Sequence, residues 1–197
     1  MKKSYFAKEK LPEGYVLSEC IDLAKNKRQM TFVTVLSLVL LVVVLLAGFI
    51  LRPGLAVFSD NSELLGLVGF LALLGYVVYI VLHEAVHGLL MWYFSKKKPH
   101  FGASLQYAYA GSDAYFRKVP YLVIALAPLV VWGMVFLWLA LIAPGIWFWL
   151  IWFFQAGNVS GAAGDLYVFA RICAMESAVL VQDDGVRMRI YAPGTDE

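Results

Sequence analysis

Residues 64–94 read LLGLVGFLALLGYVVYIVLHEAVHGLLMWYF, an apolar stretch that decides the fold class of this chain. At 1.5 Å per residue, a helix of this length would measure about 46 Å. The hydrocarbon core of a bilayer is about 30 Å thick, so the stretch is long enough to cross it. The sequence therefore predicts a transmembrane helix that tilts, kinks or projects beyond the bilayer.

Three further apolar stretches predict transmembrane helices, at residues 30–51, 120–143 and 146–170. The composition agrees, because 61% of the residues are hydrophobic and 15% are charged, whereas soluble domains have about 25% charged residues. We therefore expect an all-α integral membrane protein with four transmembrane helices. Segment 100–116 is predicted to form a small hairpin or loop, and the turn at Asp184-Gly185 predicts a β-hairpin in the C-terminal tail.

The predicted organisation is an N-terminal arm at 1–29, a four-span core at 30–170 and a tail at 171–197. Lysine and arginine gather before the first span, between the second and third, and after the fourth. Because positive loops stay in the cytosol, both termini are expected to be cytosolic. The net charge of +2 is too small to suggest nucleic-acid binding. Cys20 and Cys173 lack metal-binding or redox spacing, and we expect free thiols.

The second predicted span contains the motif His83-Glu84-Ala85-Val86-His87. On a helix, residues four apart share one face, so both imidazoles can reach a single zinc ion. Glu84 lies beside them, where a carboxylate can act as a general base toward a water molecule. Ionisable groups such as Asp, Lys or Arg cost about 2.5–3.5 kcal/mol in a membrane helix, so such clusters are rarely without a role.

A zinc site needs a third protein ligand, and Asp165 is the other acidic residue embedded in a predicted span. His83 lies 19 residues after Leu64, and Asp165 lies 19 residues after Ile146. Both helices run inward, so both positions are expected about 28 Å along them, near the cytosolic boundary. The alternative interpretation is that Asp165 is a helix-terminal acid that pairs with Arg171.

The residues before Asp165 favour close approach of two helices, because Gly157, Gly161 and Gly164 are all small. Asn158 lies seven residues before Asp165 and shares its helix face. Its amide is predicted to bind a substrate backbone, and an equally open alternative is a hydrogen bond between helices.

Several segments of the chain together resemble a family of bacterial proteins described as putative zincin peptidases, long catalogued as a domain of unknown function. More distantly, the combination resembles intramembrane zinc metalloproteases of the site-2 protease type, which have HExxH in one span and a zinc-binding Asp in a later one. In this chain Gly164 precedes Asp165 and Leu166 follows it, whereas a glycine usually follows the Asp in site-2 proteases. The segments that carry the closer resemblance are LPEGY at 11–15, HEAVHG at 83–88, YAYA at 107–110, Ala127-Pro128, and Asn158 to Asp165.

The motif and the resemblance together predict an intramembrane zinc metalloprotease of the bacterial cell membrane, with its active site near the cytosolic side. The expected zinc ligands are His83, His87 and Asp165, and the expected catalytic base is Glu84. The expected partners are the lipid bilayer and a membrane-associated protein or peptide substrate, which could add as a strand to segment 100–116. The alternatives are a non-catalytic zinc-binding membrane regulator or scaffold and, less favoured, a metal transporter.

Overall fold

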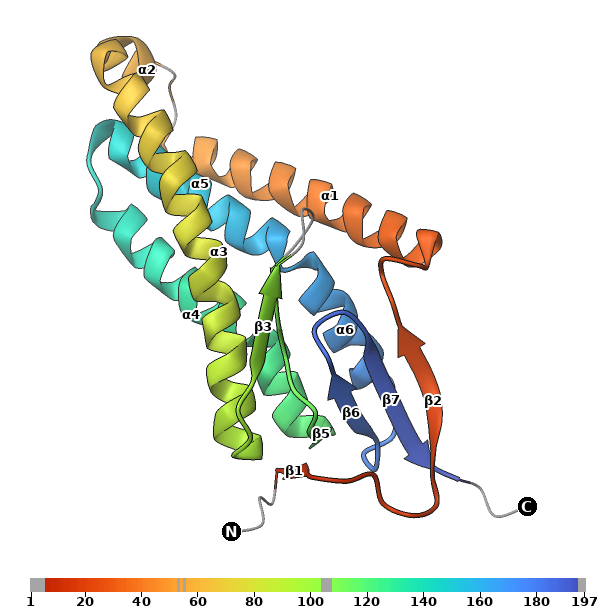
Figure 1. Ribbon diagram of the computed structural model, residues 1–197. Helices are drawn as coiled ribbons and strands as arrows, with labels where there is room; N and C mark the ends of the chain where they lie inside the picture. The colour runs from red at the N-terminus through yellow and green to blue at the C-terminus, as the bar shows by residue number, and fades with distance from the viewer. Residues whose placement is uncertain (1–5, 53, 55, 104–107, 195–197) are drawn as a thin grey trace. The chain divides into compact units, whose positions relative to one another are not determined.

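The computed structural model describes residues 6–52, 54, 56–103 and 108–194, which divide into two compact units (Figure 1). The first unit takes its described residues from 1–31, 82–128 and 165–197. The second unit takes them from 32–81 and 129–164. Helices α3 (Leu65–Ser95) and α4 (Lys118–Ile142) contribute to both units.

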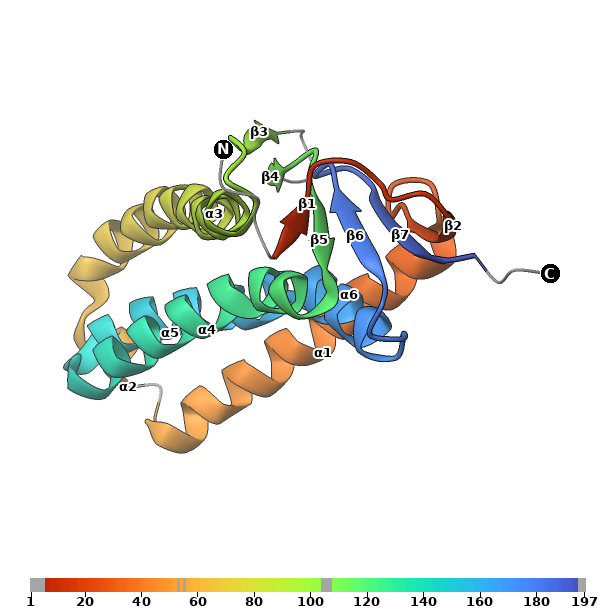
Figure 2. The same ribbon diagram turned by 90° about the horizontal axis from the view of Figure 1, so that it is seen from below.

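A five-stranded antiparallel sheet forms the first unit, with the strand order β1-β5-β6-β7-β2 (Figure 2). Strand β7 pairs with β6 on one side and with β2 on the other, so the tail and the N-terminal arm are neighbours in the sheet. A bulge between Leu17 and Glu19 interrupts the pairing of β2. The strands are β1 (Ala7–Lys8), β2 (Tyr15–Ile21), β5 (Tyr115–Arg117), β6 (Leu180–Asp183) and β7 (Met188–Pro193).

Three helical segments complete the first unit: the end of α3, the start of α4, and α6 (Ala163–Cys173). Their apolar side chains share one core with the sheet, in which Phe116, Val181, Ile190 and Ile172 are fully buried. Strands β3 (His100–Ala103) and β4 (Ala108–Gly111) form a separate two-stranded hairpin. The core therefore joins the helix that carries the HExxH motif to the sheet.

The second unit contains α1 (Lys27–Leu51) beyond Thr31, α2 (Ala56–Asp60), a 3-10 turn (Ser62–Leu64), α5 (Gly145–Gly161) and the remaining parts of α3 and α4. Helices α1 and α5 meet closely, because the Trp152 indole lies against Gly48, where an added Cβ would be 2.3 Å from the indole nitrogen. That nitrogen also donates a 2.8 Å hydrogen bond to the Val44 carbonyl.

Within the described residues, three helical stretches are long and apolar enough to cross a membrane: 27–51, 62–95 and 118–142. Large apolar side chains point outward from them, including Ile50, Leu73 and Leu141, which are 81%, 72% and 66% exposed. Continuous apolar surface of this kind is unfavourable in water and is satisfied by lipid. The predictions for these three spans agree with the structure.

The prediction of a fourth span at 146–170 is wrong. In its place α5 ends at Gly161 and α6 begins at Ala163, and α6 packs on the core of the sheet. Gly161 and Gly164 flank the break, and each glycine disfavours a continuous helix by about 1 kcal/mol relative to alanine. Of the small residues predicted to form a packing surface, Gly157 does pack against Tyr76, whereas Gly161 and Gly164 flank the end of the helix.

The prediction of an all-α fold is also wrong, because the arm, the tail and residues 115–117 form the five-stranded sheet. Strands β1 and β5 have two and three residues, which is too short for an alternating pattern to reveal them. The C-terminal hairpin exists, but as two inner strands of this sheet. Segment 100–116 does contain a hairpin, although Leu105 and Tyr107, which suggested it, lie outside the described residues.

The pairing of β2 with β7 can be tested with a cysteine cross-link, because Cys20 lies opposite Arg189. Directly paired antiparallel residues have Cα atoms about 4.5–5.5 Å apart, within the roughly 4.4–6.8 Å range of disulfides. In a Cys173→Ser background, Arg189→Cys is expected to form a disulfide with Cys20 under mild oxidation. The measurement is peptide mass spectrometry together with a count of maleimide-reactive thiols.

The matched control is Ala192→Cys, which lies opposite Val16, three residues farther along the strand. Three residues span about 10 Å, so this variant is expected to keep both thiols free. Equal cross-linking of the two variants would mean that the N-terminal arm is not held in this register.

Candidate metal centre

Helix α3 places His83 and His87 side by side on its buried face. The helix is continuous from Leu65 to Ser95, so residues four apart stand one above the other. The two imidazole rings have centroids 5.1 Å apart, and the residues are 9% and 8% exposed. The spacing predicted from the motif is therefore present in the fold, with both rings directed away from bulk solvent.

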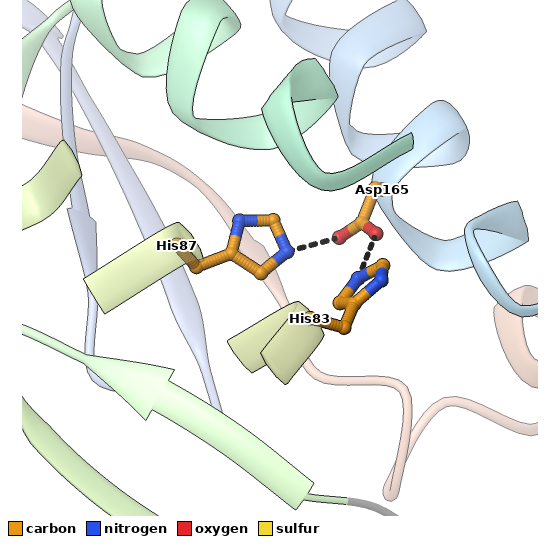
Figure 3. Close-up of side chains that lie close together, drawn as sticks. All are labelled: His83, His87 and Asp165. Carbon is orange, nitrogen blue, oxygen red and sulfur yellow. Dashed lines mark ion pairs between the residues drawn. The ribbon is translucent and has the colours of Figure 1, made fainter. Parts of the chain in front are cut away.

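The Asp165 carboxylate, in the first turn of α6, lies between these two rings (Figure 3). Its Oδ2 is 3.4 Å from His83 Nε2, and its Oδ1 is 3.6 Å from His87 Nε2. One ligand atom from each residue lies within 4.8 Å of the other two. The three residues belong to the same unit, so the structure brings together the ligand set that the sequence predicts.

These distances fit a tetrahedral zinc ion. Protein nitrogen and oxygen ligands bind zinc at about 2.0–2.2 Å, so two ligand atoms of one tetrahedral ion lie about 3.4 Å apart. The separations of 3.4 and 3.6 Å are close to this value, each to a different oxygen of Asp165, and one ligand atom from each residue lies within 4.8 Å of the other two. Two imidazoles and one carboxylate also form a donor set typical of catalytic zinc, which leaves a fourth position for water or substrate.

The hydrogen bond on the other nitrogen of His87 identifies its tautomer. His87 Nδ1 lies 2.9 Å from the Ile124 carbonyl oxygen, which can only accept, so Nδ1 carries the proton. In the neutral ring, Nε2 then presents a lone pair toward the Asp165 carboxylate. The backbone of α4 thus favours the tautomer whose Nε2 could bind a metal ion.

Glu84 shares a cavity of about 150 Å³ with His87 and Asp165. The backbone N–H of Ala110, in β4, donates a hydrogen bond to the Glu84 carboxylate. The Asp165 side chain remains 28% exposed, so the centre is accessible to small molecules. Glu84, the general base that the sequence predicts, therefore lies next to two of the candidate metal ligands and accepts a hydrogen bond from the β3–β4 hairpin.

Gly88 allows that hairpin to approach α3 directly after the motif. A Cβ at this position would lie 2.3 Å from Cζ of Phe101, in β3, so any larger residue would displace the aromatic ring. On the opposite side, the Ser112 N–H donates a 2.7 Å hydrogen bond to the Asp183 carbonyl, which ties the end of β4 to β6. The hairpin is thus anchored between α3 and the sheet.

Two residues of the cavity wall, Tyr121 and Asp183, were not predicted from the sequence to belong to the site. The Tyr121 hydroxyl donates a 2.5 Å hydrogen bond to Asp183 Oδ2, and the Gly185 N–H donates to Oδ1 at 2.8 Å. Burial raises the pKa of the Asp183 carboxyl, although these two hydrogen bonds oppose the shift. The available signal was the Asp183-Asp184-Gly185 turn, which gave no indication that Asp183 faces inward.

The alternative prediction, an ion pair between Asp165 and Arg171, does not agree with the structure. Arg171 instead forms a two-point ion pair with Glu19, in which Nη2 lies 2.7 Å from Oε2 and Nε lies 3.2 Å from Oε1. The bond joins α6 to β2. Asp165 is thus directed toward the histidines rather than toward the basic end of its own helix.

Asn158 belongs to the second unit and has its hydrogen bonds there. It is fully buried, accepts a 2.9 Å hydrogen bond from the Tyr79 hydroxyl, and donates one of 3.1 Å to the Leu129 carbonyl. An added Cβ at the neighbouring Gly157 would lie 2.5 Å from the Tyr76 ring. These contacts favour the interpretation of Asn158 and the glycines as elements of helix packing, and substrate binding by Asn158 stays a prediction.

One protein-family model matches the sequence of this chain. A family model described as putative zincin peptidase matches residues 76–180, which include the HExxH motif and Asp165. A search of curated proteins found no match, and a search of solved structures found none either. The matched segment covers more than half of the chain and confirms the resemblance seen in its motifs, so the chain belongs to the family of putative zincin peptidases.

Proposed function

We propose that this protein is a zinc metallopeptidase that hydrolyses peptide bonds of membrane-associated substrates. The observation that carries the proposal is the convergence of ligand atoms of His83, His87 and Asp165 within 4.8 Å. Glu84 lines one cavity together with His87 and Asp165. Membership in the zincin peptidase family supports zinc as the ion. The three apolar helices support a site close to the membrane.

Zinc held by these residues would supply a Lewis acid that polarises a carbonyl and lowers the pKa of water toward about 7. Glu84 would take a proton from the attacking water and pass it to the leaving amine. The hydrogen bond from Ala110 limits the rotation of its carboxylate. The bond between His87 and the Ile124 carbonyl would keep that imidazole in the metal-binding tautomer through the cycle.

Strand β4 is a suitable surface for an extended substrate. Within the described residues, β4 pairs with β3 on one side only, and Ala108, Tyr109 and Ala110 line the cavity. A helical substrate has its carbonyls occupied by hydrogen bonds and must unwind before attack. We therefore propose that substrate adds along the second edge of β4, where main-chain hydrogen bonds would replace those lost on unwinding.

We propose that the N-terminal arm, the segment between α3 and α4 and the tail face the cytosol of a bacterial cell, because all three contribute strands to one sheet. Three long apolar helices alone would leave the two termini on opposite sides, so the chain must return through the shorter α5. Lysine and arginine gather before α1, between α3 and α4, and after α6. His83 is the nineteenth residue of α3, about 27 Å from the start of the helix at 1.5 Å per residue. The proposed site then lies near the cytosolic side of a bilayer core about 30 Å thick.

Metal content gives the first test of this proposal. The purified full-length protein is expected to bind one zinc ion per chain, measured by elemental analysis after removal of loosely bound metal. Asp165→Ala removes one of three ligands and is expected to weaken zinc binding by more than about 100-fold, since loss of a mere supporting group costs about 10–100-fold. Wild-type protein without zinc after reconstitution would contradict the proposal.

The role of Glu84 is tested by Glu84→Gln, which removes the base and keeps all three ligands. We expect full zinc content and a loss of peptide hydrolysis of at least about 100-fold, the usual contribution of a positioned general base. Hydrolysis is measured as cleavage of membrane proteins from the native host, compared by mass spectrometry in cells expressing either protein.

The control is Glu63→Gln, the same chemical change at an exposed position outside the cavity. This variant is expected to match the wild type in zinc content and cleavage. Zinc binding by all three proteins together with identical membrane proteomes would favour the alternative of a non-catalytic zinc protein.

A further inference from the structure

The wall of the cavity beside the candidate metal centre contains a second acidic region, which has no role in the proposed hydrolysis. This region is formed by Asp183, on β6, and by the Tyr121 hydroxyl that donates to it. The cavity measures about 150 Å³, and a cavity of about this size accommodates a molecule as large as benzene. It therefore has room for one side chain rather than for a length of peptide.

Within the described part of the chain, Asp183 has no lysine or arginine at ion-pair distance. The two groups that hydrogen-bond to it, the Tyr121 hydroxyl and the Gly185 N–H, are neutral. The two arginines of the adjoining turn and β7 pair with other carboxylates, Arg187 with that of Asp22 and Arg189 with that of Asp184. The two arginines nearest to Asp183 in sequence are thus already paired with other carboxylates.

The charges around the cavity do not balance when a metal is counted. Three carboxylates line it, those of Glu84, Asp165 and Asp183, and its described lining contains no lysine or arginine. A divalent ion at the proposed centre would balance two of these three charges. The Asp183 carboxyl would then have no cation of its own, and its burial, which also raises its pKa, makes the ionised form unfavourable until a cation binds.

The apolar part of the cavity wall indicates which kind of cation would fit the cavity. Met91, Val168 and Met188 form this part, from α3, α6 and β7. A flexible aliphatic chain packs against such a surface while its charged end reaches a polar group. Lysine and arginine have this combination. A neutral apolar side chain would leave Asp183 without a counter-ion, and an acidic one would be repelled.

We propose that this cavity is a specificity pocket that binds a lysine or arginine side chain of the substrate, with Asp183 holding its cationic group. The proposal rests on the function proposed above and names the class of substrate. Asp183 lies beyond the segment 76–180 that the family model matches, so the family match assigns it no role.

Hydroxamates test the pocket without a known substrate, because the hydroxamate group binds the metal and leaves the side chain to probe the cavity. The probes are Nα-acetyl-lysine hydroxamate, whose side chain ends in an ammonium group, and Nα-acetyl-norleucine hydroxamate, whose side chain ends in a methyl group. Norleucine hydroxamate with a free α-amine places the positive charge at the amino terminus instead. Binding to the zinc-loaded, full-length protein in detergent is measured by isothermal titration calorimetry.

The acetylated lysine probe is expected to bind at least about ten-fold more tightly than its norleucine counterpart, since pairing of a desolvated charge is worth at least this much. Asp183→Asn is nearly isosteric, retains an oxygen for the Gly185 N–H, and is expected to abolish the difference. Asp183→Glu retains the charge and is expected to keep a preference. Asp113→Asn, the same change at an exposed position, is the matched control and should behave as wild type.

Each other outcome has a distinct meaning. Equal affinity for the two acetylated probes would overturn the pocket and leave the metal centre intact. Tighter binding of the probe with the free α-amine, lost in Asp183→Asn, would assign the charge to a substrate amino terminus and overturn the side-chain proposal. Two zinc ions per chain, falling to one in Asp183→Asn, would make Asp183 a metal ligand. Absence of zinc would contradict the proposed function itself.

Discussion

The candidate site depends on holding two imidazole nitrogens 3.4 and 3.6 Å from the two oxygens of one carboxylate. A proton on the imidazole nitrogen or a metal ion between the groups makes this contact attractive, and the surrounding fold keeps the three side chains together. Three separate constraints do so: the four-residue spacing on α3, the Ile124 carbonyl that orients His87, and the core that fixes α6 on the sheet. The sheet thus supports a centre whose ligands all come from helices.

The clustering of the three candidate ligands was predictable because their geometry is local or depends on helix length alone. His83 and His87 follow from a single helical repeat, and Asp165 follows from counting residues along two apolar segments. The count led to the residue that lies beside the two histidines even though its assumption of a continuous helix from 146 to 170 is wrong, because the break between α5 and α6 occurs at a single residue, Ala162.

The sheet and the second acidic region of the cavity could not be predicted in the same way. Strand β2 pairs with β7 across most of the length of the chain, and β5 is only three residues long. Long-range pairing leaves no periodic signal in a short segment. Asp183 was visible only as part of a turn, and its inward direction is set by the pairing of β6 with β5 and β7 and by its bond to Tyr121.

The position of β7 has a consequence for biogenesis. Among the described strands it is made last, yet it lies between β6 and β2 and connects them into one sheet. At a synthesis rate of about 5–20 residues per second, the apolar helices leave the ribosome several seconds before Met188–Pro193. We therefore expect the cavity, which Met188 helps to line, to be completed only after the apolar helices have been made.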